Sequence, residues 1–335
     1  MDAIHDCYSQ ISIVFSLGDS YEKIISKFYI NVFLTKQKRH AIRSKFLRKE
    51  VLRQKKVEYQ VVKQKLKDAC GTDLLVPGRF LEYDLIFGIG ATCHVTSVLG
   101  THCLRRFSTP FDWTGGVPQS DWMAVPDVWR DTRFSNKINM LLRNFDGDFE
   151  RENFKLVSAG IKERSHHIVV DVKNGVRYMH HFPIDKSLES YFPEFYNTMK
   201  RRADRLSQAI KVSNRILILW IHRFSDQVDI LDDLVSDKDA IDAMKKLKQA
   251  YPDKDFDIVF FECDGNKTGY EFEKNMVDDG IFRIRSNHYV VEDAYRFKYP
   301  YVNLTIQPII AEALDNISLT GLLKDMQTKT GWLSD

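Results

Sequence analysis

The run RILILWI, residues 215–221, has six apolar residues in seven and no alternation of polar and apolar side chains. Such a strand needs apolar neighbours on both faces, which is the situation of a parallel strand covered by helices. A second run of this kind, DIVFFEC at 257–263, follows a predicted helix over 238–250. Strand, helix and strand in this order predict a parallel βαβ unit, and therefore an α/β protein.

Further elements extend from this unit in both directions. We expect a helix over 190–212 before it and a helix near 270–279 after it, followed by the strand IFRIRS and by helices toward the C-terminus. The expected fold is α/β with a mixed sheet. In it a cysteine stands at the N-terminus of a helix that follows a strand, a β-hairpin carries a histidine, and the C-terminal part is parallel.

The cysteine belongs to the segment YDLIFGIGATCHVTSVLG, residues 83–100. Its first half predicts a buried strand that ends in glycines, and a helix follows over about 91–99 with Gly100 at its end. A thiolate at Cys93, in the first helical turn, is stabilised by the helix dipole and by free backbone N–H groups, which also suit an oxyanion. Gly90 lets a substrate approach the backbone closely. The alternative is that Cys93 is a small packed core residue.

A hairpin offers a base for this thiol. In HHIVVDVKNGVRYMHHFP, residues 166–183, the pair Asn174-Gly175 separates two β-rich runs and predicts a two-residue turn. The resulting register places His180 and Asp171 on one face, diagonal to each other, and His181 on the opposite face. We therefore expect His180 as general base and Asp171 as the group that orients it. The alternative is that both histidines are ordinary strand residues.

The loop LRRFSTPFDW, residues 104–113, follows the cysteine helix. This loop, with Arg105, is expected to line a site, and His181 is a further substrate-binding candidate. The alternative is a packed aromatic loop in which Asp112 caps a turn.

Four stretches of the sequence together resemble a bacterial family described as papain-like cysteine peptidases. They are the cysteine segment, LRRFSTPFDW, HHFP, and the basic helix MKRRADRLSQAI that runs into RILILWIHR. The resemblance covers roughly residues 83–225. It implies Cys93 as nucleophile, His180 as general base, and Asp112 and Trp113 as residues that line the site. The family's His-Asp-Phe motif is His180-His181-Phe182 here, which is why the orienting role is assigned to Asp171. Members of the family are linked to the biosynthesis of capsule, lipopolysaccharide and other surface polysaccharides.

Three hypotheses for the function follow. The first is a Cys-His hydrolase or acyltransferase acting on the amide, ester or thioester of a small-molecule, glycan or peptide substrate. The second is an acyltransferase that uses CoA or acyl-CoA to modify a surface polysaccharide, with Arg105, Arg106, Arg201 and Arg202 available for phosphates. The third is a non-catalytic scaffold of a membrane-associated glycan-assembly complex.

Composition bounds these hypotheses. Five cysteines are scattered through 335 residues without a C-x-x-C pair, which disfavours a disulfide framework and a zinc ribbon, and no metal site is expected. Cys103 and Cys263 are expected in the core. The sequence shows no signal peptide and no apolar run of about 18 residues. We therefore expect a cytoplasmic protein, with peripheral attachment to the inner membrane as an option.

Charge is unevenly distributed. Residues 36–67 hold 13 Lys and Arg against two acidic residues, although the whole chain carries only +3. We predict one long basic helix over 36–69. It is either a solvated helix packed on the main domain or a helix that contacts a membrane surface or a protein. Nucleic acid is disfavoured as a partner, because no aromatic stacking pattern interrupts the charges. We therefore expect residues 1–75 to form an N-terminal helical extension and residues 76–335 to form the α/β catalytic domain.

Overall fold

The computed structural model describes residues 75–90, 94–116, 133–158, 166–222, 235–263, 272–286 and 308–330. The chain divides into two units, residues 1–62 and residues 63–335, and every described residue belongs to the second. The predicted basic helix over 36–69 lies outside the described residues. Within the described part, no helix is both long enough and apolar enough to cross a membrane.

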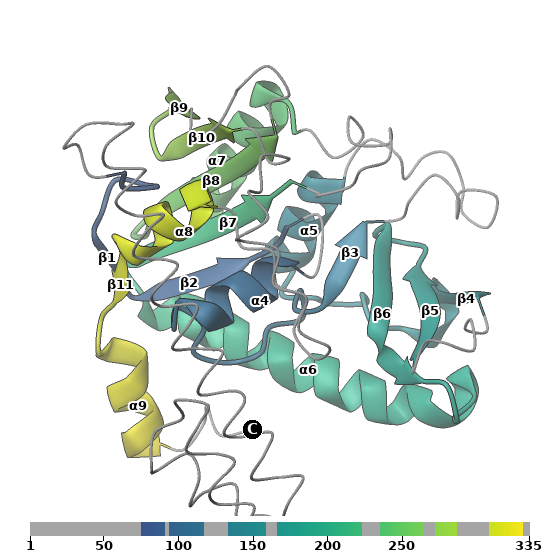
Figure 1. Ribbon diagram of the computed structural model, residues 1–335. Coiled ribbons are helices and arrows are strands. Elements are labelled where there is room, and N and C mark those ends of the chain that lie inside the picture. Colours follow the sequence, from purple (N-terminus) through teal and green to yellow (C-terminus); the bar gives the residue numbers. More distant parts are fainter. Residues whose placement is uncertain are drawn as a thin grey trace, which may run out of the picture. The chain divides into compact units, whose positions relative to one another are not determined.

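A five-stranded sheet has the order β2-β7-β8-β10-β9 (Figure 1). Its first four members are parallel to one another, and β9 pairs antiparallel with β10. The run RILILWI forms the central strand β7 and is buried from its second residue onward. The predicted α/β class and the parallel βαβ unit are therefore confirmed. The strands are β2 (Leu85–Gly88), β7 (Arg215–Ile221), β8 (Asp255–Cys263), β9 (Phe272–Asp278) and β10 (Ile281–Ser286).

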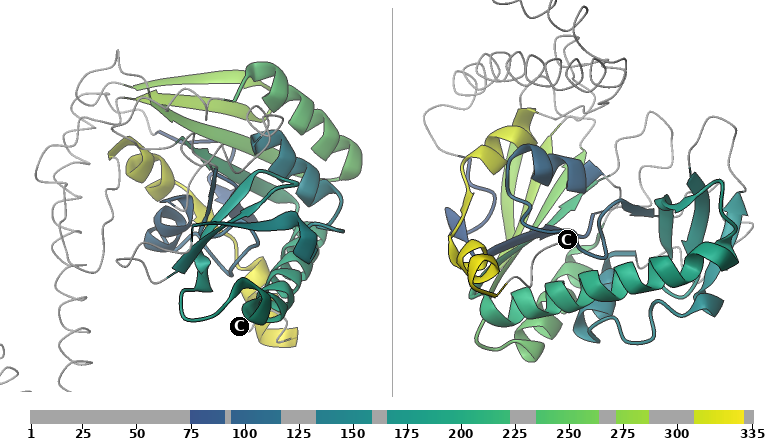
Figure 2. Two further views of the ribbon diagram at one scale, coloured as in Figure 1. Left: turned by 90° about the vertical axis from the view of Figure 1, so that its right-hand side faces the viewer. Right: turned by 90° about the horizontal axis from the view of Figure 1, so that it is seen from below.

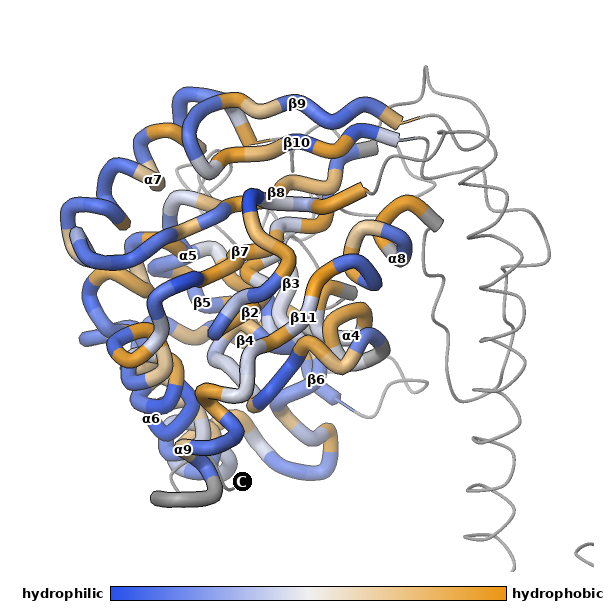
Figure 3. Tube along the Cα trace, turned by 90° about the vertical axis from the view of Figure 1, so that its left-hand side faces the viewer, coloured by the Kyte–Doolittle hydropathy of each residue, from blue (hydrophilic) through white to orange (hydrophobic). Residues whose placement is uncertain are grey.

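The helix α7 (Asp237–Ala250) lies between β7 and β8 in the chain. It begins at Ser236, whose hydroxyl accepts a hydrogen bond from the backbone N–H of Asp239 at 3.1 Å. Acidic residues in the first turn add a favourable interaction with the helix dipole. Apolar and charged residues alternate along the helix (Figure 3), and the apolar face enters the core. The buried residues of that face are Ala240, Ala243, Met244 and Leu247.

The helix predicted near 270–279 is wrong, because the segment forms the strand β9. Gly280 has a φ of +78°, a conformation that favours glycine, and it completes the turn that returns the chain as β10. Lys274 stretches over the ring of Phe282 on β10, with its Nζ 4.8 Å from the ring centroid. The side chains of β9 are largely exposed, as expected for an edge strand that uses the backbone groups of β10 rather than a buried face.

A second sheet of four antiparallel strands has the order β3-β6-β5-β4. The hairpin predicted from the sequence forms its centre. The strands are β3 (Thr114–Gly116), β4 (Phe154–Ser158), β5 (His166–Asp171) and β6 (Val176–Pro183).

The helix α6 (Leu188–Val212) runs along both sheets (Figures 1 and 2). It begins at Ser187, whose hydroxyl accepts from the N–H of Ser190 at 3.2 Å. One apolar face packs against both sheets, so that side chains from the two sheets belong to one hydrophobic core. The apolar residues of this face are Leu188, Phe192, Phe195, Met199, Ala203, Leu206, Ala209 and Ile210.

The remaining described elements are short. They are β1 (Glu82–Tyr83), α4 (His94–Thr101), α5 (Arg133–Leu142), the 3-10 helix η3 (Arg151–Asn153), α8 (Pro308–Asp315), β11 (Ser318–Leu319) and α9 (Leu322–Thr330). The strands β1 and β11 form a two-stranded parallel pair.

The end of α4 departs from the prediction. The helix continues past Gly100, and its last turn closes with hydrogen bonds from the N–H of Leu104 to Leu99 O (2.9 Å) and from the N–H of Cys103 to Gly100 O (3.3 Å). Cys103 takes the left-handed conformation that this motif requires, with a φ of +58°. Its side chain is exposed, so the expectation that Cys103 lies in the core is wrong.

Candidate functional site

The loop between α4 and β3 is anchored to α4 through Thr96. The hydroxyl of Thr96 donates to Asp112 Oδ1 at 3.3 Å and accepts from the backbone N–H of Trp113 at 3.1 Å. Two residues predicted to line the site are thus fixed to this helix. Thr96 is three residues after Cys93 in the sequence, although Cys93 itself lies outside the described residues.

Asp112 is buried and ion-paired with Arg105. Its Oδ2 accepts from Arg105 Nε at 2.9 Å and from the N–H of Thr109 at 3.0 Å, while Arg105 also donates to Ser108 Oγ at 2.7 Å. Asp112 is only 3% exposed, and these donors replace the water that its carboxylate loses on burial. Asp112 therefore fixes the loop, and the guanidinium of Arg105 is partly committed to it.

His180 and Trp113 lie together. Their ring centroids are 5.8 Å apart with the planes at 69°, which is an edge-to-face contact. His166 on β5 approaches His180 from another side, at 6.2 Å between centroids. The side chain of His180 is exposed. The predicted base and one predicted site-lining residue are thus brought together from distant parts of the chain.

The predicted register of the hairpin is wrong. The turn covers Val172–Gly175, and Asp171 pairs directly with Val176. The register then shifts. Between the pairs Val169–Tyr178 and His167–Phe182, β5 has one residue and β6 has three. This bulge turns His180 away from the buried face that Tyr178 and Phe182 share.

The bulge brings His181 against α6 instead. Its ring contacts Tyr178 at 5.2 Å and Phe195 at 6.0 Å, between centroids, and Arg202 Nη1 lies 3.5 Å from its Nε2. Burial, followed by the nearby charge of Arg202, lowers the pKa of His181 to about 3. His181 is therefore neutral at neutral pH, and it lies on the side of Tyr178 rather than on the predicted opposite face.

The prediction that Asp171 orients His180 depended on a hairpin register that the structure does not have. His180 is four residues beyond Val176, the pairing partner of Asp171, and thus on the order of 13 Å away along a strand. The Asp171 carboxylate instead accepts from the N–H groups of Lys173 (2.9 Å) and Asn174 (3.2 Å) and from Asn174 Nδ2 (2.7 Å). It holds the hairpin turn in place.

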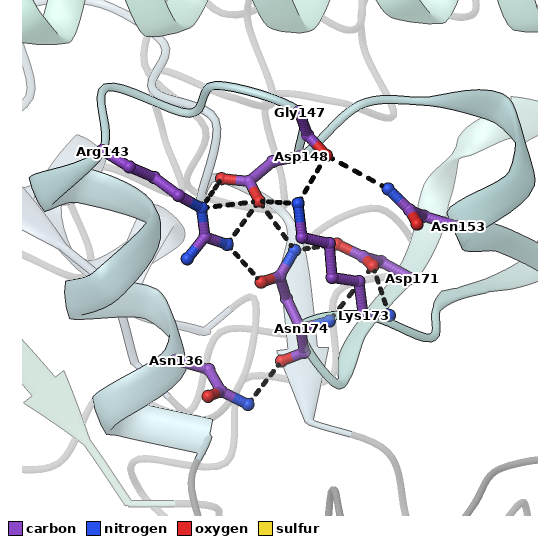
Figure 4. Close-up of polar contacts among 8 residues, drawn as sticks. All are labelled: Asn136, Arg143, Gly147, Asp148, Asn153, Asp171, Lys173 and Asn174. Carbon is purple, nitrogen blue, oxygen red and sulfur yellow. Dashed lines mark hydrogen bonds and ion pairs between the residues drawn. The ribbon is translucent and has the colours of Figure 1, made fainter.

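A second buried carboxylate, Asp148, lies beside this turn (Figure 4). It accepts from Arg143 Nε at 2.9 Å and from Asn174 Nδ2 at 3.2 Å, and Lys173 Nζ lies 3.5 Å away. Burial, and to a lesser degree the charge of Asp148, raises the pKa of Asp171 to about 7. The hydrogen bonds that Asp171 accepts act in the opposite direction and lower this pKa. The cluster ties α5 to the β5–β6 turn, so its role is structural.

Sequence reasoning missed a buried lysine beside Gly90. Lys137 on α5 is 2% exposed, and its Nζ donates to the carbonyls of Ile89 (3.1 Å) and Gly90 (2.9 Å) and lies 3.5 Å from Thr114 Oγ1. It thereby fixes the backbone at the end of β2. A signal was present, because Lys137 shares the apolar stripe of α5 with the core residues Phe134, Ile138 and Leu141.

Arg202, which lies beside His181, is close enough to several other charged side chains to be influenced by them. Burial lowers the pKa of Arg202. The negative charge of Asp112 raises this pKa, whereas the positive charges of three arginines lower it. These arginines are Arg105, Arg205 and Arg201. A partly buried guanidinium surrounded by like charges favours an anion nearby. The site thus combines an exposed histidine, an indole and the guanidinium of Arg202.

Comparisons of the chain with protein-family models, with curated proteins and with solved structures gave no match.

Proposed function

We propose that the protein is a cysteine-nucleophile enzyme in which Cys93 attacks the carbonyl carbon of an amide, ester or thioester and His180 acts as general base. The observation that carries the proposal is the contact between His180 and Trp113, whose N–H is bonded to Thr96 of α4. That helix is described from His94, the residue after Cys93. A nucleophile and a base need this kind of common support.

Of the two neighbouring histidines, His180 is the better base. A general base works best with a pKa near the operating pH, and the pKa of His181, about 3, leaves it unable to hold a proton at neutral pH. His181 also has the cationic Arg202 beside its Nε2. His180 is exposed and lies against the ring of Trp113.

The reaction proceeds in two halves. His180 takes the thiol proton, the Cys93 sulfur forms a bond to the carbonyl carbon, and the carbonyl oxygen becomes an oxyanion. Collapse of this intermediate expels an amine, alcohol or thiol, which receives the proton from His180, and leaves a thioester on Cys93. Water or another acceptor then attacks the thioester, so hydrolysis and acyl transfer share the first half.

A CoA-dependent acyltransferase is the second candidate. The observation that favours it is the set of arginines around Arg202, because anions such as phosphates bind where guanidinium groups converge. A role in capsule or lipopolysaccharide biosynthesis remains the expectation given by the family resemblance.

The test is the rate of iodoacetamide alkylation at Cys93 as a function of pH, followed by peptide mass spectrometry. We expect an apparent pKa below the ordinary thiol value of about 8.5 and a rise in that pKa in His180→Ala. Cys103, which is exposed at the end of α4, is an internal comparison whose labelling His180→Ala leaves unchanged. Alkylation of Cys93 only after unfolding contradicts the proposal.

A further inference from the structure

A groove of about 700 Å³ lies between α6 and α9. Its wall on the α6 side is a polar stripe at helical spacing, and Met326 of α9 contributes an apolar surface. Figure 2, in the view from below, shows α9 beside the C-terminal part of α6. The volume is within the range of about 300–1,000 Å³ typical of small-molecule sites. The α6 stripe consists of Asn197, Lys200, Arg201, Asp204, Arg205 and Gln208.

The groove is cationic. Lys200, Arg201 and Arg205 face it together with a single acid, Asp204. Lys200 and Arg201 are exposed, and neither makes a hydrogen bond or ion pair with another described residue. Arg205 is only 5% exposed, so its guanidinium is presented from a largely desolvated position. Three cations against one acid give the groove a net positive charge, which attracts an anion.

The helix α6 contributes residues to the groove and, through Arg202, a residue beside the candidate site. This residue neighbours Arg201 in the chain, and its Nη1 lies 3.5 Å from His181 Nε2, next to His180. The like charges of Arg105, Arg201 and Arg205 disfavour the charged form of Arg202. An anion bound near these arginines relieves this repulsion.

We propose that this groove binds the phosphate groups of a small phosphorylated ligand. The proposal deepens the proposed function and rests on it for the ligand's role, which is to carry the acyl group. Three cations in one groove match a phosphate or pyrophosphate, whose oxygens accept several charge-assisted hydrogen bonds at once. Met326 gives the ligand's apolar part a surface to contact.

The experiment is isothermal titration calorimetry of the full chain with inorganic pyrophosphate and with CoA. The variant Lys200→Gln/Arg201→Gln removes two charges from exposed positions of the groove, so it is expected to fold. We expect this variant to bind both probes at least about tenfold more weakly, because it loses charge-assisted hydrogen bonds, which are stronger than hydrogen bonds between neutral groups. The matched control, Lys238→Gln/Lys245→Gln, removes two exposed charges from α7 and should change affinity by less than about twofold.

The proposal fails if the wild type binds neither probe, or if the α7 control weakens binding as much as the groove variant, which indicates general electrostatic attraction. Binding of pyrophosphate alone, lost in the groove variant, supports a phosphate site whose ligand is not CoA. The titrations are repeated in Cys93→Ala, which should bind as the wild type does. If the probes bind the groove but the Cys93 thiol does not react with iodoacetamide, the phosphate site is supported and the proposed function is contradicted.

Discussion

The indole of Trp113 meets the imidazole of His180 edge-on, with ring centroids 5.8 Å apart. The two residues come from different parts of the chain, the loop after α4 and the bulge of β6, and sequence spacing does not bring them together. Their contact connects the helix that follows Cys93 to the strand that carries the proposed base. The strength of that connection depends on how Thr96 anchors the loop.

Replacing Thr96 with Val should destabilise the protein by about 1–3 kcal/mol, because it removes one partner of a buried carboxylate and of a backbone N–H. Chemical denaturation measures the loss. Thr198→Val is the control, since Thr198 on α6 makes no hydrogen bond through its side chain with another described residue. Equal effects of the two substitutions contradict the anchoring role of Thr96.

Asp171 should make the free energy of unfolding fall as pH rises. Its pKa in the folded protein, about 7, exceeds the ordinary value of 3.8, so folding favours the protonated form. Its contribution to stability is complete below about pH 4 and is lost as pH rises through about 7. Asp171→Asn stays neutral, so the variant should gain stability relative to the wild type across that window. Urea unfolding at several pH values measures this, with the exposed Asp146→Asn as control.

His181 should remain neutral to well below pH 5, because burial and Arg202 hold its pKa at about 3. A base with a depressed pKa in the folded state contributes stability above its unfolded value of about 6.5 and loses it as pH falls toward 3. Arg202→Gln removes the second of these causes and should raise the pKa of His181. Two-dimensional NMR of the imidazole nitrogens reports it directly. A His181 resonance that titrates near pH 6.5 in the wild type refutes the assignment.

Two glycines should respond in opposite directions to substitution by Ala. At Gly280 a Cβ lies 2.5 Å from Phe256 O and the φ of +78° is unfavourable for alanine, so we expect a loss of at least about 2 kcal/mol. At Gly100, within α4, a Cβ meets nothing within 4 Å, so we expect a gain of roughly 0.5–1 kcal/mol. Thermal unfolding compares them, and a stable Gly280→Ala contradicts the β9–β10 turn.

The sequence by itself determined the parallel part of the fold and the existence of the hairpin. The run 215–221 is apolar at nearly every position, and a strand with no polar face has to be buried on both sides. The pair Asn174-Gly175 separates two β-rich runs, which predicts a turn. In the structure Gly175 takes a positive φ of +65°, as glycine often does in turns. These signals are local, and no distant contact has to supply them.

Tertiary structure decided the rest. The segment 272–278 has no strong period, and the exposed edge of β10 made it a strand. The bulge in β6 turns His180 outward toward Trp113 and packs His181 against Phe195 of α6, a contact between residues far apart in sequence. Lys137 is buried because the carbonyls at the end of β2 come within reach of its amine. In each case the partner that fixes the residue comes from another element, so the energy that selects the arrangement exists only once the chain has folded.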